Sequence, residues 1–236
     1  VKGSTLLLAA LICVVTFFSV QEYLRIIFGN DTGPISKTIK AISYICSLAL
    51  VASASLGSWG LMFLILAMDL MALSIFVLTR FASNRAIFDI IAKQVLGMVY
   101  IPVPLSLLVF IKDLDGGTLW VLWLLIVIFA NDTGALYTGT FLGKKPLSPT
   151  ISPKKTVEGA CGGVFAGMLA GFIFCFLFFG DLALALLTVP GAFILTLVGQ
   201  VGDLFESAMK RASRIKDSGS ILPGHGGMLD RIDGLL

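Results

Sequence analysis

The sequence predicts an all-α integral membrane protein, a polytopic bundle of about seven transmembrane helices. Of its 236 residues, 57% are hydrophobic and only 13% are charged, whereas a soluble domain carries about 25% charged residues. The mean hydropathy of +0.99 excludes an intrinsically disordered chain, because disorder requires low hydrophobicity. The apolar runs are continuous rather than alternating, which excludes a β-barrel.

The spans follow from the length of the apolar runs, since a helix needs about 20 apolar residues to cross the hydrocarbon core. Seven stretches qualify, at residues 4–20, 39–56, 59–79, 91–111, 118–139, 159–180 and 182–202. Very short links separate the second span from the third and the sixth span from the seventh. These links predict two antiparallel helical hairpins.

Lysine and arginine fall almost entirely on one side of these spans. Of the 17 basic residues, only Lys2 and Lys112 lie on the other side. The positive-inside rule makes the basic side cytoplasmic. Two long segments, 140–158 and 203–234, emerge on that side, where a soluble anion would meet the protein.

We treat the chain as a single transmembrane domain, 1–236, with N-terminal packing spans in 1–130 and a functional half in 131–236. The sequence lacks an initial Met and stops where a new apolar run could begin, so we expect further sequence at one or both ends.

The segment 203–217 has a pattern suited to phosphate chemistry. Read as a helix, it places Asp203, Ser207, Lys210 and Arg214 on one face. A carboxylate followed by cations is suited to holding a metal ion beside phosphate groups. The alternative is a basic amphipathic helix that lies on anionic lipid headgroups.

A glycine-rich turn follows, with the only histidine, His225, between its glycines. Glycines let a backbone approach phosphates closely and direct its N–H groups at them. Asp230 and Asp233 come next, and their carboxylates are hard oxygen ligands suited to Mg²⁺. The alternative is a flexible connector before another span.

The segment 140–158 carries three prolines, which we expect to stiffen its path, together with Lys154 and Lys155, which attract anions. Either Ser152 or Thr156 is placed to cap the helix that follows. A helix N-terminus at this point favours a bound phosphate.

Two carboxylates lie inside predicted spans, Asp69 and Asp132. Charged side chains in a span are costly and usually face a cavity or a partner. Both are therefore candidates for function, and the alternative for Asp69 is a protonated or hydrogen-bonded packing residue.

Glycines recur at every fourth position of the sixth span, which places Gly159, Gly163, Gly167 and Gly171 on one helix face. Small residues at this spacing permit close helix contact. The contact is either internal to the fold or part of a homodimer.

The strongest pattern runs from Ser207 to Asp233. Its elements are Ser207, Lys210-Arg211, Lys216-Asp217, His225-Gly226-Gly227, Asp230-Arg231 and Asp233. In order and spacing this segment resembles the signature of the CDP-diacylglycerol synthase family, also called phosphatidate cytidylyltransferase. The segments 131–137, 151–159 and 202–203 also resemble parts of that family, so the resemblance covers about 130–234.

The resemblance implies a reaction in which CTP and phosphatidic acid give CDP-diacylglycerol and pyrophosphate in phospholipid biosynthesis. It also implies a requirement for Mg²⁺, with room for a second, monovalent cation such as K⁺. The expected partners are CTP, phosphatidic acid and membrane lipids, with no nucleic acid. The expected location is a bacterial inner membrane, with the active site facing the cytoplasm.

By position, the resemblance assigns roles to individual residues. The expected metal ligands are Asp203, Asp230 and Asp233, which together with Lys210 form the catalytic set. The expected substrate-binding residues are Asp132, Lys154, Lys155, Ser207, Arg211, Lys216, His225, Gly226, Gly227 and Arg231. Two other functions stay open, a CTP-dependent lipid kinase acting on a polyprenol and a non-enzymatic carrier of an anionic metabolite.

Overall fold

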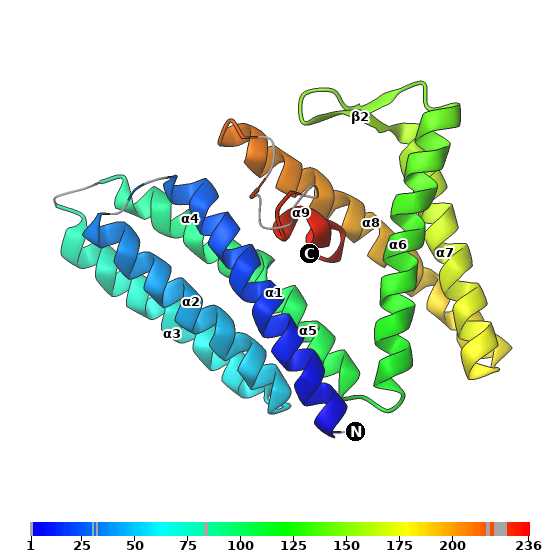
Figure 1. Ribbon diagram of the computed structural model, residues 1–236, viewed down its shortest axis with the longest axis horizontal. Helices are drawn as coiled ribbons and strands as arrows, with labels where there is room; N and C mark the ends of the chain where they lie inside the picture. Colours follow the sequence, from blue (N-terminus) through cyan, green and yellow to red (C-terminus); the bar gives the residue numbers. More distant parts are fainter. Residues whose placement is uncertain (1, 30, 32, 83–84, 216–217, 220–225) are drawn as a thin grey trace. The chain divides into compact units, whose positions relative to one another are not determined.

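The computed structural model describes residues 2–29, 31, 33–82, 85–215, 218–219 and 226–236. These residues are almost entirely helical (Figure 1). The elements in chain order are α1 (Lys2–Phe28), α2 (Pro34–Ser55), α3 (Trp59–Arg80), α4 (Ile87–Tyr100), α5 (Pro102–Lys112), α6 (Gly117–Leu142), β1 (Pro146–Ser148), β2 (Ser152–Thr156), α7 (Val157–Phe179), α8 (Leu182–Ala212), α9 (Leu229–Ile232) and the short 3₁₀ helix η1 (Asp233–Leu235).

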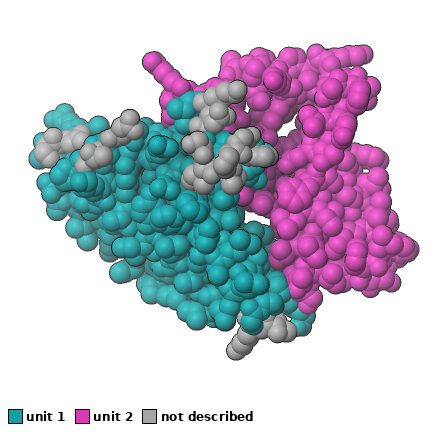
Figure 2. Space-filling view, viewed as in Figure 1, with its two compact units in different colours: residues 1–115, 215–231 teal, residues 116–214, 232–236 magenta. Residues whose placement is uncertain are grey.

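The chain forms two compact units, which are coloured separately in Figure 2. Unit 1 comprises residues 1–115 and 215–231, and unit 2 comprises residues 116–214 and 232–236. The segment 215–231 therefore belongs with the first five helices rather than with α8, which precedes it in the sequence.

The predicted fold class is confirmed. Within the described ranges, seven helical segments are long and apolar enough to cross a membrane. The first extends to Phe28 rather than ending near residue 20, and the last runs unbroken for 31 residues to Ala212. Both extensions carry charged residues, which a search for apolar runs leaves out.

The fourth span consists of two helices, α4 and α5, rather than the single helix expected over 91–111. Proline explains the break, because Pro102 and Pro104 have no backbone N–H to donate to the preceding turn. The residue before a proline is also driven from ideal helical geometry, and Ile101 has φ −102° and ψ −66°.

In unit 1, α1 and α4 pack closely at Gly97. A Cβ at this position would overlap the ring of Tyr23, whose hydroxyl donates a hydrogen bond of 2.6 Å to the carbonyl of Lys93. The contact places the C-terminal half of α1 firmly against α4.

Asp69 lies in the interior of the same unit. It is 3% exposed, and the amide Nε2 of Gln94 approaches it at 3.4 Å and donates to the hydroxyl of Ser43 at 3.1 Å. These contacts match the packing alternative for Asp69, in which a polar cluster joins α2, α3 and α4.

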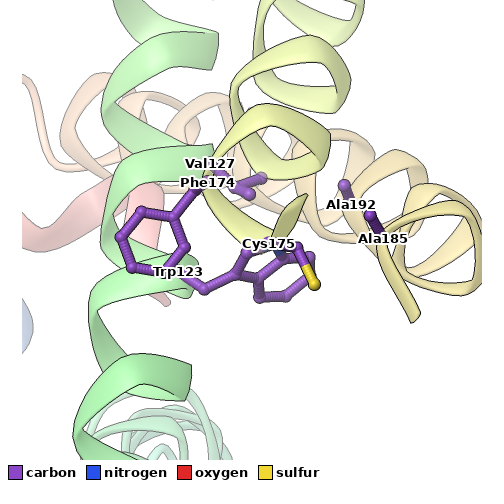
Figure 3. Close-up of a cluster of buried hydrophobic side chains, with 6 residues drawn as sticks. All are labelled: Trp123, Val127, Phe174, Cys175, Ala185 and Ala192. Carbon is purple, nitrogen blue, oxygen red and sulfur yellow. The ribbon is translucent and has the colours of Figure 1, made fainter. Parts of the chain in front are cut away.

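In unit 2, α6, α7 and α8 share a hydrophobic cluster of Trp123, Val127, Phe174, Cys175, Ala185 and Ala192 (Figure 3). The indole N–H of Trp123 donates to the carbonyl of Gly171 at 3.0 Å. A large aromatic side chain of α6 thus reaches α7 where a glycine leaves its carbonyl accessible.

The glycine face of α7 packs against α6. A Cβ at Gly163 would lie 2.7 Å from the carbonyl oxygen of Asn131 and 2.9 Å from the Cβ of Ala135. A Cβ at Gly167 would lie 2.9 Å from the carbonyl oxygen of Val127. The face is therefore used inside the fold, and it gives no support to the predicted homodimer.

The segment 140–158 contains a β-hairpin, in which β1 and β2 pair antiparallel. Thr156 caps α7, because its hydroxyl oxygen accepts the N–H of Gly159 at 3.1 Å. This result decides between the two predicted caps in favour of Thr156. The carboxylate of Glu158 accepts the N–H groups of Lys144 and Lys145 at 3.0 and 3.1 Å, which ties the start of the hairpin to the same helix end.

The predicted helix over 203–217 ends earlier than expected. Helix α8 stops at Ala212, and Arg214 adopts a left-handed backbone conformation with φ 57°. A left-handed residue cannot continue a right-handed helix. Asp203, Ser207 and Lys210 therefore lie on α8 as predicted, whereas the expectation that Arg214 shares their face is wrong.

Candidate active site

Unit 2 contains a cavity of about 450 Å³ between α6, the hairpin, α7 and α8. Several of the predicted site residues lie on its wall. Its polar lining includes Asn131, Asp132, Lys154, Lys155, Gln200 and Asp203. The structure thus gathers, from α6, β2 and α8, residues that the sequence analysis singled out in three separate segments.

An ion pair between Lys155 and Asp203 lies in this cavity. About 30% of each side chain stays exposed, so the pair is within reach of a ligand. Lys154 lines the same cavity and is more exposed than its neighbour. Two cations of the hairpin therefore stand at one opening, and one of them neutralises a carboxylate of α8.

A chain of amide groups holds Asp132 in place. The side chain of Gln200 donates to the side-chain oxygen of Asn131 at 2.8 Å and to the carbonyl of Ala160 at 3.0 Å. Asn131 in turn donates to Asp132 at 3.2 Å. The sequence analysis missed Gln200, because an amide among apolar residues carries no motif of its own.

The carboxyl group of Asp233 interacts electrostatically with the carboxylates of Asp203 and Asp132. Burial raises the pKa of the Asp233 carboxyl to about 7, and the nearby carboxylates of Asp203 and Asp132 also raise it. The backbone of η1 approaches α6, since a Cβ at Gly234 would lie 3.3 Å from an oxygen of Asp132. Unit 2 therefore concentrates three carboxylates whose mutual repulsion a cation would relieve.

Farther along α8, Lys210 forms an ion pair of 2.8 Å with Glu206. Glu206 is fully buried, and the sequence analysis missed it. The ammonium of Lys210 also lowers the pKa of the Asp233 carboxyl, which opposes the effect of the carboxylates of Asp203 and Asp132. Lys210 therefore lies between a buried carboxylate of its own helix and the carboxylates of unit 2.

The remaining predicted residues of α8 and α9 lie at more open positions. Ser207 is half-buried, Arg231 is exposed, and the guanidinium of Arg211 donates to the carbonyl of Ile151 at 3.4 Å. That contact links the end of α8 to the turn of the hairpin. Lys216 and His225 lie outside the described residues.

Asp230 belongs to unit 1, where it organises the turn that precedes it. Its carboxylate accepts the N–H of Ser218 at 3.0 Å and the N–H of Gly227 at 2.9 Å. Gly226, beside it, has φ 82°, a conformation that glycine adopts without strain. The backbone of the predicted phosphate-binding turn is thus held by a carboxylate that was predicted to bind metal.

Sequence reasoning missed Glu22 of α1, which the same turn contacts. Its carboxylate accepts the N–H of Leu229 at 2.8 Å and the N–H of Met228 at 3.0 Å. A charged residue within an apolar run was the available signal, but the predicted first span ended before it.

The predicted metal set of Asp203, Asp230 and Asp233 is divided between the two units. Among the residues that the structure describes, no three His, Cys, Asp or Glu side chains form a ready metal cage. The donor chemistry nevertheless fits a hard cation, because the carboxylates of unit 2 offer only oxygen ligands.

Comparison with known proteins agrees with the resemblance seen in the signature. The profile of the cytidylyltransferase family matches residues 1–236. A phosphatidate cytidylyltransferase of Bacillus subtilis (strain 168) is 39% identical over 165 residues, which cover 67% of this chain and 59% of the relative. One of Helicobacter pylori (strain ATCC 700392 / 26695) is 48% identical over 123 residues, which cover 52% of this chain and 45% of the relative.

A third relative, the phosphatidate cytidylyltransferase of Staphylococcus aureus (strain COL), is 37% identical over 173 residues, which cover 73% of this chain and 64% of the relative. The chain therefore spans less than two thirds of the length of the curated relatives that it matches.

Proposed function

Because this chain belongs to the cytidylyltransferase family, we propose that it transfers the cytidylyl group of CTP to phosphatidate, giving CDP-diacylglycerol and pyrophosphate. The observation that carries the proposal is the cavity of unit 2, where Lys155 pairs with Asp203 beside Asp132. Cations, carboxylates and amide groups on one wall suit a polyphosphate ligand and its counter-ion.

The reaction needs no protein nucleophile. An oxygen of the lipid phosphate attacks the α-phosphorus of CTP, the new oxygen–phosphorus bond forms, and the bond to the bridging oxygen of the β-phosphate breaks. The electron pair leaves with pyrophosphate. Catalysis of such a transfer consists mostly of positioning and charge neutralisation, which are the tasks that the side chains of the cavity are suited to perform.

Lys154 and Lys155 bring positive charge to the phosphates at the cavity opening. The hydrogen bonds of Gln200 and Asn131 fix Asp132 in the same cavity, and Lys210 adds a further cation on α8. Lys155 exchanges its contact with Asp203 for a substrate phosphate as substrate enters. Each residue thus binds or orients an anion.

Mg²⁺ is the proposed cofactor. Asp203 and Asp233 of unit 2 would hold it, with Asp132 beside them. The family resemblance also assigns the role of metal ligand to Asp230. Bound there, the ion would neutralise phosphate charge and ease the departure of pyrophosphate. A monovalent cation such as K⁺ is proposed as a second ion, since several carboxylates gather in unit 2.

We propose the cytoplasmic face of a bacterial inner membrane as the location of the site. The distribution of basic residues supports this orientation, because the hairpin lysines belong to the side that holds all but Lys2 and Lys112. CTP is a cytoplasmic solute, and phosphatidate arrives within the bilayer.

The test is a turnover assay in detergent micelles with CTP labelled on its α-phosphorus, phosphatidate and Mg²⁺. Labelled CDP-diacylglycerol with matching pyrophosphate supports the proposal, whereas conversion of CTP to CDP with phosphorylation of a polyprenol would indicate the lipid kinase. Flux into proteoliposomes without turnover would indicate the carrier.

A matched pair of variants on one helix tests the site. Asp203→Asn removes a charge from the cavity and should lower kcat about 10²-fold or more. Asp181→Asn makes the same change at the other end of α8, where the side chain caps the helix by accepting the N–H groups of Ala183 and Leu184. Asparagine caps helices as well as aspartate does, so this variant should keep wild-type activity.

A further inference from the structure

Glu22 is a buried carboxylate in α1, a helix that is largely apolar. Its side chain is 2% exposed, and it lies in the span Gly3–Phe28. A buried carboxylate is tolerated only where hydrogen bonds or counter-charges compensate for the lost water. The partners of Glu22 therefore explain why it is there.

Three hydrogen bonds reach this carboxylate from the far end of the chain. One oxygen accepts the N–H of Met228 at 3.0 Å. The other accepts the N–H of Leu229 at 2.8 Å and the hydroxyl of Ser218 at 2.9 Å. All four residues belong to unit 1. We call residues 218–219 and 226–230 the docked residues.

Two glycines make room for this contact. A Cβ at Gly219 or at Gly227 would overlap the carboxylate of Glu22. Neither position has φ in the left-handed range, so the requirement for glycine is steric. The carboxylate thus approaches the backbone of the docked residues more closely than any side chain at these positions would allow.

The docked residues connect Glu22 to Asp230. Ser218 donates its hydroxyl to Glu22 and its backbone N–H to Asp230 at 3.0 Å. Gly227 donates its N–H to Asp230 at 2.9 Å, and the next two N–H groups along the chain go to Glu22. The two carboxylates therefore share donors from Ser218 and from residues 227–229.

We propose that Glu22 is a positioning residue, which fixes the docked residues on α1 and thereby sets the position of Asp230, the metal ligand that the family resemblance adds. Its catalytic consequence rests on the proposed function. Glu22 acts only as an acceptor, and it touches no reacting atom. Both of its oxygens accept backbone N–H groups at once, so a side chain with one acceptor oxygen cannot replace it.

The test compares Glu22→Gln with the wild-type protein by hydrogen exchange and by kinetics. A glutamine keeps one acceptor oxygen and turns an NH₂ group against the other backbone N–H. We expect the amides of residues 227–229 to exchange at least about tenfold faster, whereas amides of α6 keep their rates. Since a displacement of about 1 Å costs on the order of 10²-fold in rate, kcat per folded molecule should fall by roughly that factor, with a smaller change in KM for CTP.

Glu158→Gln is the matched control for exchange. Glu158 also accepts two backbone N–H groups, those of Lys144 and Lys145, but it holds the hairpin of unit 2. This variant should speed exchange at the hairpin and leave residues 227–229 unchanged. Asp89→Asn, which loses an exposed ion pair with Lys93, controls for charge and should keep wild-type kcat.

Two milder variants keep the test decisive if Glu22→Gln folds poorly. Ser218→Ala removes one of the three hydrogen bonds and should speed exchange at 227–229 several-fold. Glu22→Asp keeps the charge on a shorter side chain and should retain more activity than Glu22→Gln. A loss of fold alone would lower the amount of folded protein and leave its kcat unchanged.

Unchanged exchange at 227–229 in both Glu22→Gln and Ser218→Ala would overturn the proposal. So would faster exchange with kcat per folded molecule within about twofold of wild type. If the wild-type protein forms no CDP-diacylglycerol, the proposed function fails, and the exchange rates still support or overturn the positioning of the docked residues by Glu22.

Discussion

Substitution of Gly163 by alanine tests the closest helix contact near the site. A Cβ at this position would lie 2.7 Å from the carbonyl oxygen of Asn131, 2.8 Å from its side-chain oxygen and 2.9 Å from the Cβ of Ala135. Two of these atoms are part of, or directly attached to, the backbone of α6. The added methyl group therefore has to move a helix rather than a flexible side chain.

The cost follows from these distances. Carbon atoms pack at about 3.5–4.0 Å, and a gap of about 0.5–1 Å forfeits a quarter to a half of each dispersion contact. Restoring normal contact at Gly163 separates α6 from α7 locally by roughly 1 Å. Overpacking typically costs about 1–3 kcal/mol, and alanine regains about 1 kcal/mol over glycine in a helix. We expect a net loss of up to about 2 kcal/mol.

Gly191→Ala is the control, because its Cβ would meet only the ring of Trp123, at an ordinary 3.8 Å. This variant should be as stable as the wild type or more stable by up to about 1 kcal/mol. Both variants would be unfolded by denaturing detergent and followed by circular dichroism, and then assayed for turnover.

The two substitutions should change stability in opposite directions. Gly163→Ala should also lower kcat, since it displaces Asn131 and with it the hydrogen bond to Asp132. A Gly163→Ala protein as stable and as active as Gly191→Ala would refute the reasoning from the α6–α7 contact.

Three further outcomes are expected. Lys155→Gln breaks the pair with Asp203 and should lower kcat/KM for CTP about 10²-fold. Lys154→Gln, at the more exposed neighbouring position, should lower kcat/KM less than about fivefold. Equal losses in the two variants would contradict the role assigned to the Lys155–Asp203 pair. Removal of divalent cations with EDTA should abolish turnover, and Mg²⁺ should restore it where K⁺ alone does not; turnover that persists in EDTA would remove the metal proposal. Asp69→Ala should lower the free energy of unfolding by about 1–3 kcal/mol, because Gln94 loses a hydrogen-bond acceptor. The protein that folds should keep the wild-type kcat. A lower kcat of the folded protein would indicate that Asp69 has a functional role.

Local chemistry made part of the structure predictable. The seven spans follow from runs of apolar residues, and Thr156 caps α7 because a hydroxyl at that position reaches an N–H three residues on. The break between α4 and α5 at Ile101 was also predictable from the local sequence, because Pro102 and Pro104 lie just after it. It was missed because hydropathy continues through the prolines.

Contacts between distant segments were harder to predict. The glycine face of α7 indicated close packing, but its partner, α6, depends on the fold rather than on the spacing of the glycines. Lys155 and Asp203 were each singled out, and their pairing was not. A sequence pattern marks a residue for function without saying which other residue it meets.

Glu22 shows the limit most clearly. Hydropathy ended the first span at residue 20, so this carboxylate fell into a loop where a charge needs no explanation. The helix in fact continues to Phe28, and the groups that compensate the charge lie 196 to 207 positions later in the sequence. No local pattern connects the two.

That separation has a consequence for biosynthesis. Ribosomes add about 5–20 residues per second, so roughly 10–40 s pass between the synthesis of Glu22 and that of Leu229, which lies 207 positions later. During this interval the carboxylate has entered its helix without its hydrogen-bond donors, and it must stay hydrated, protonated or shielded by an insertion partner. The contact between α1 and the docked residues is therefore completed only after translation has passed residue 229, and a nascent chain stalled before Ser218 lacks all three of these hydrogen-bond donors.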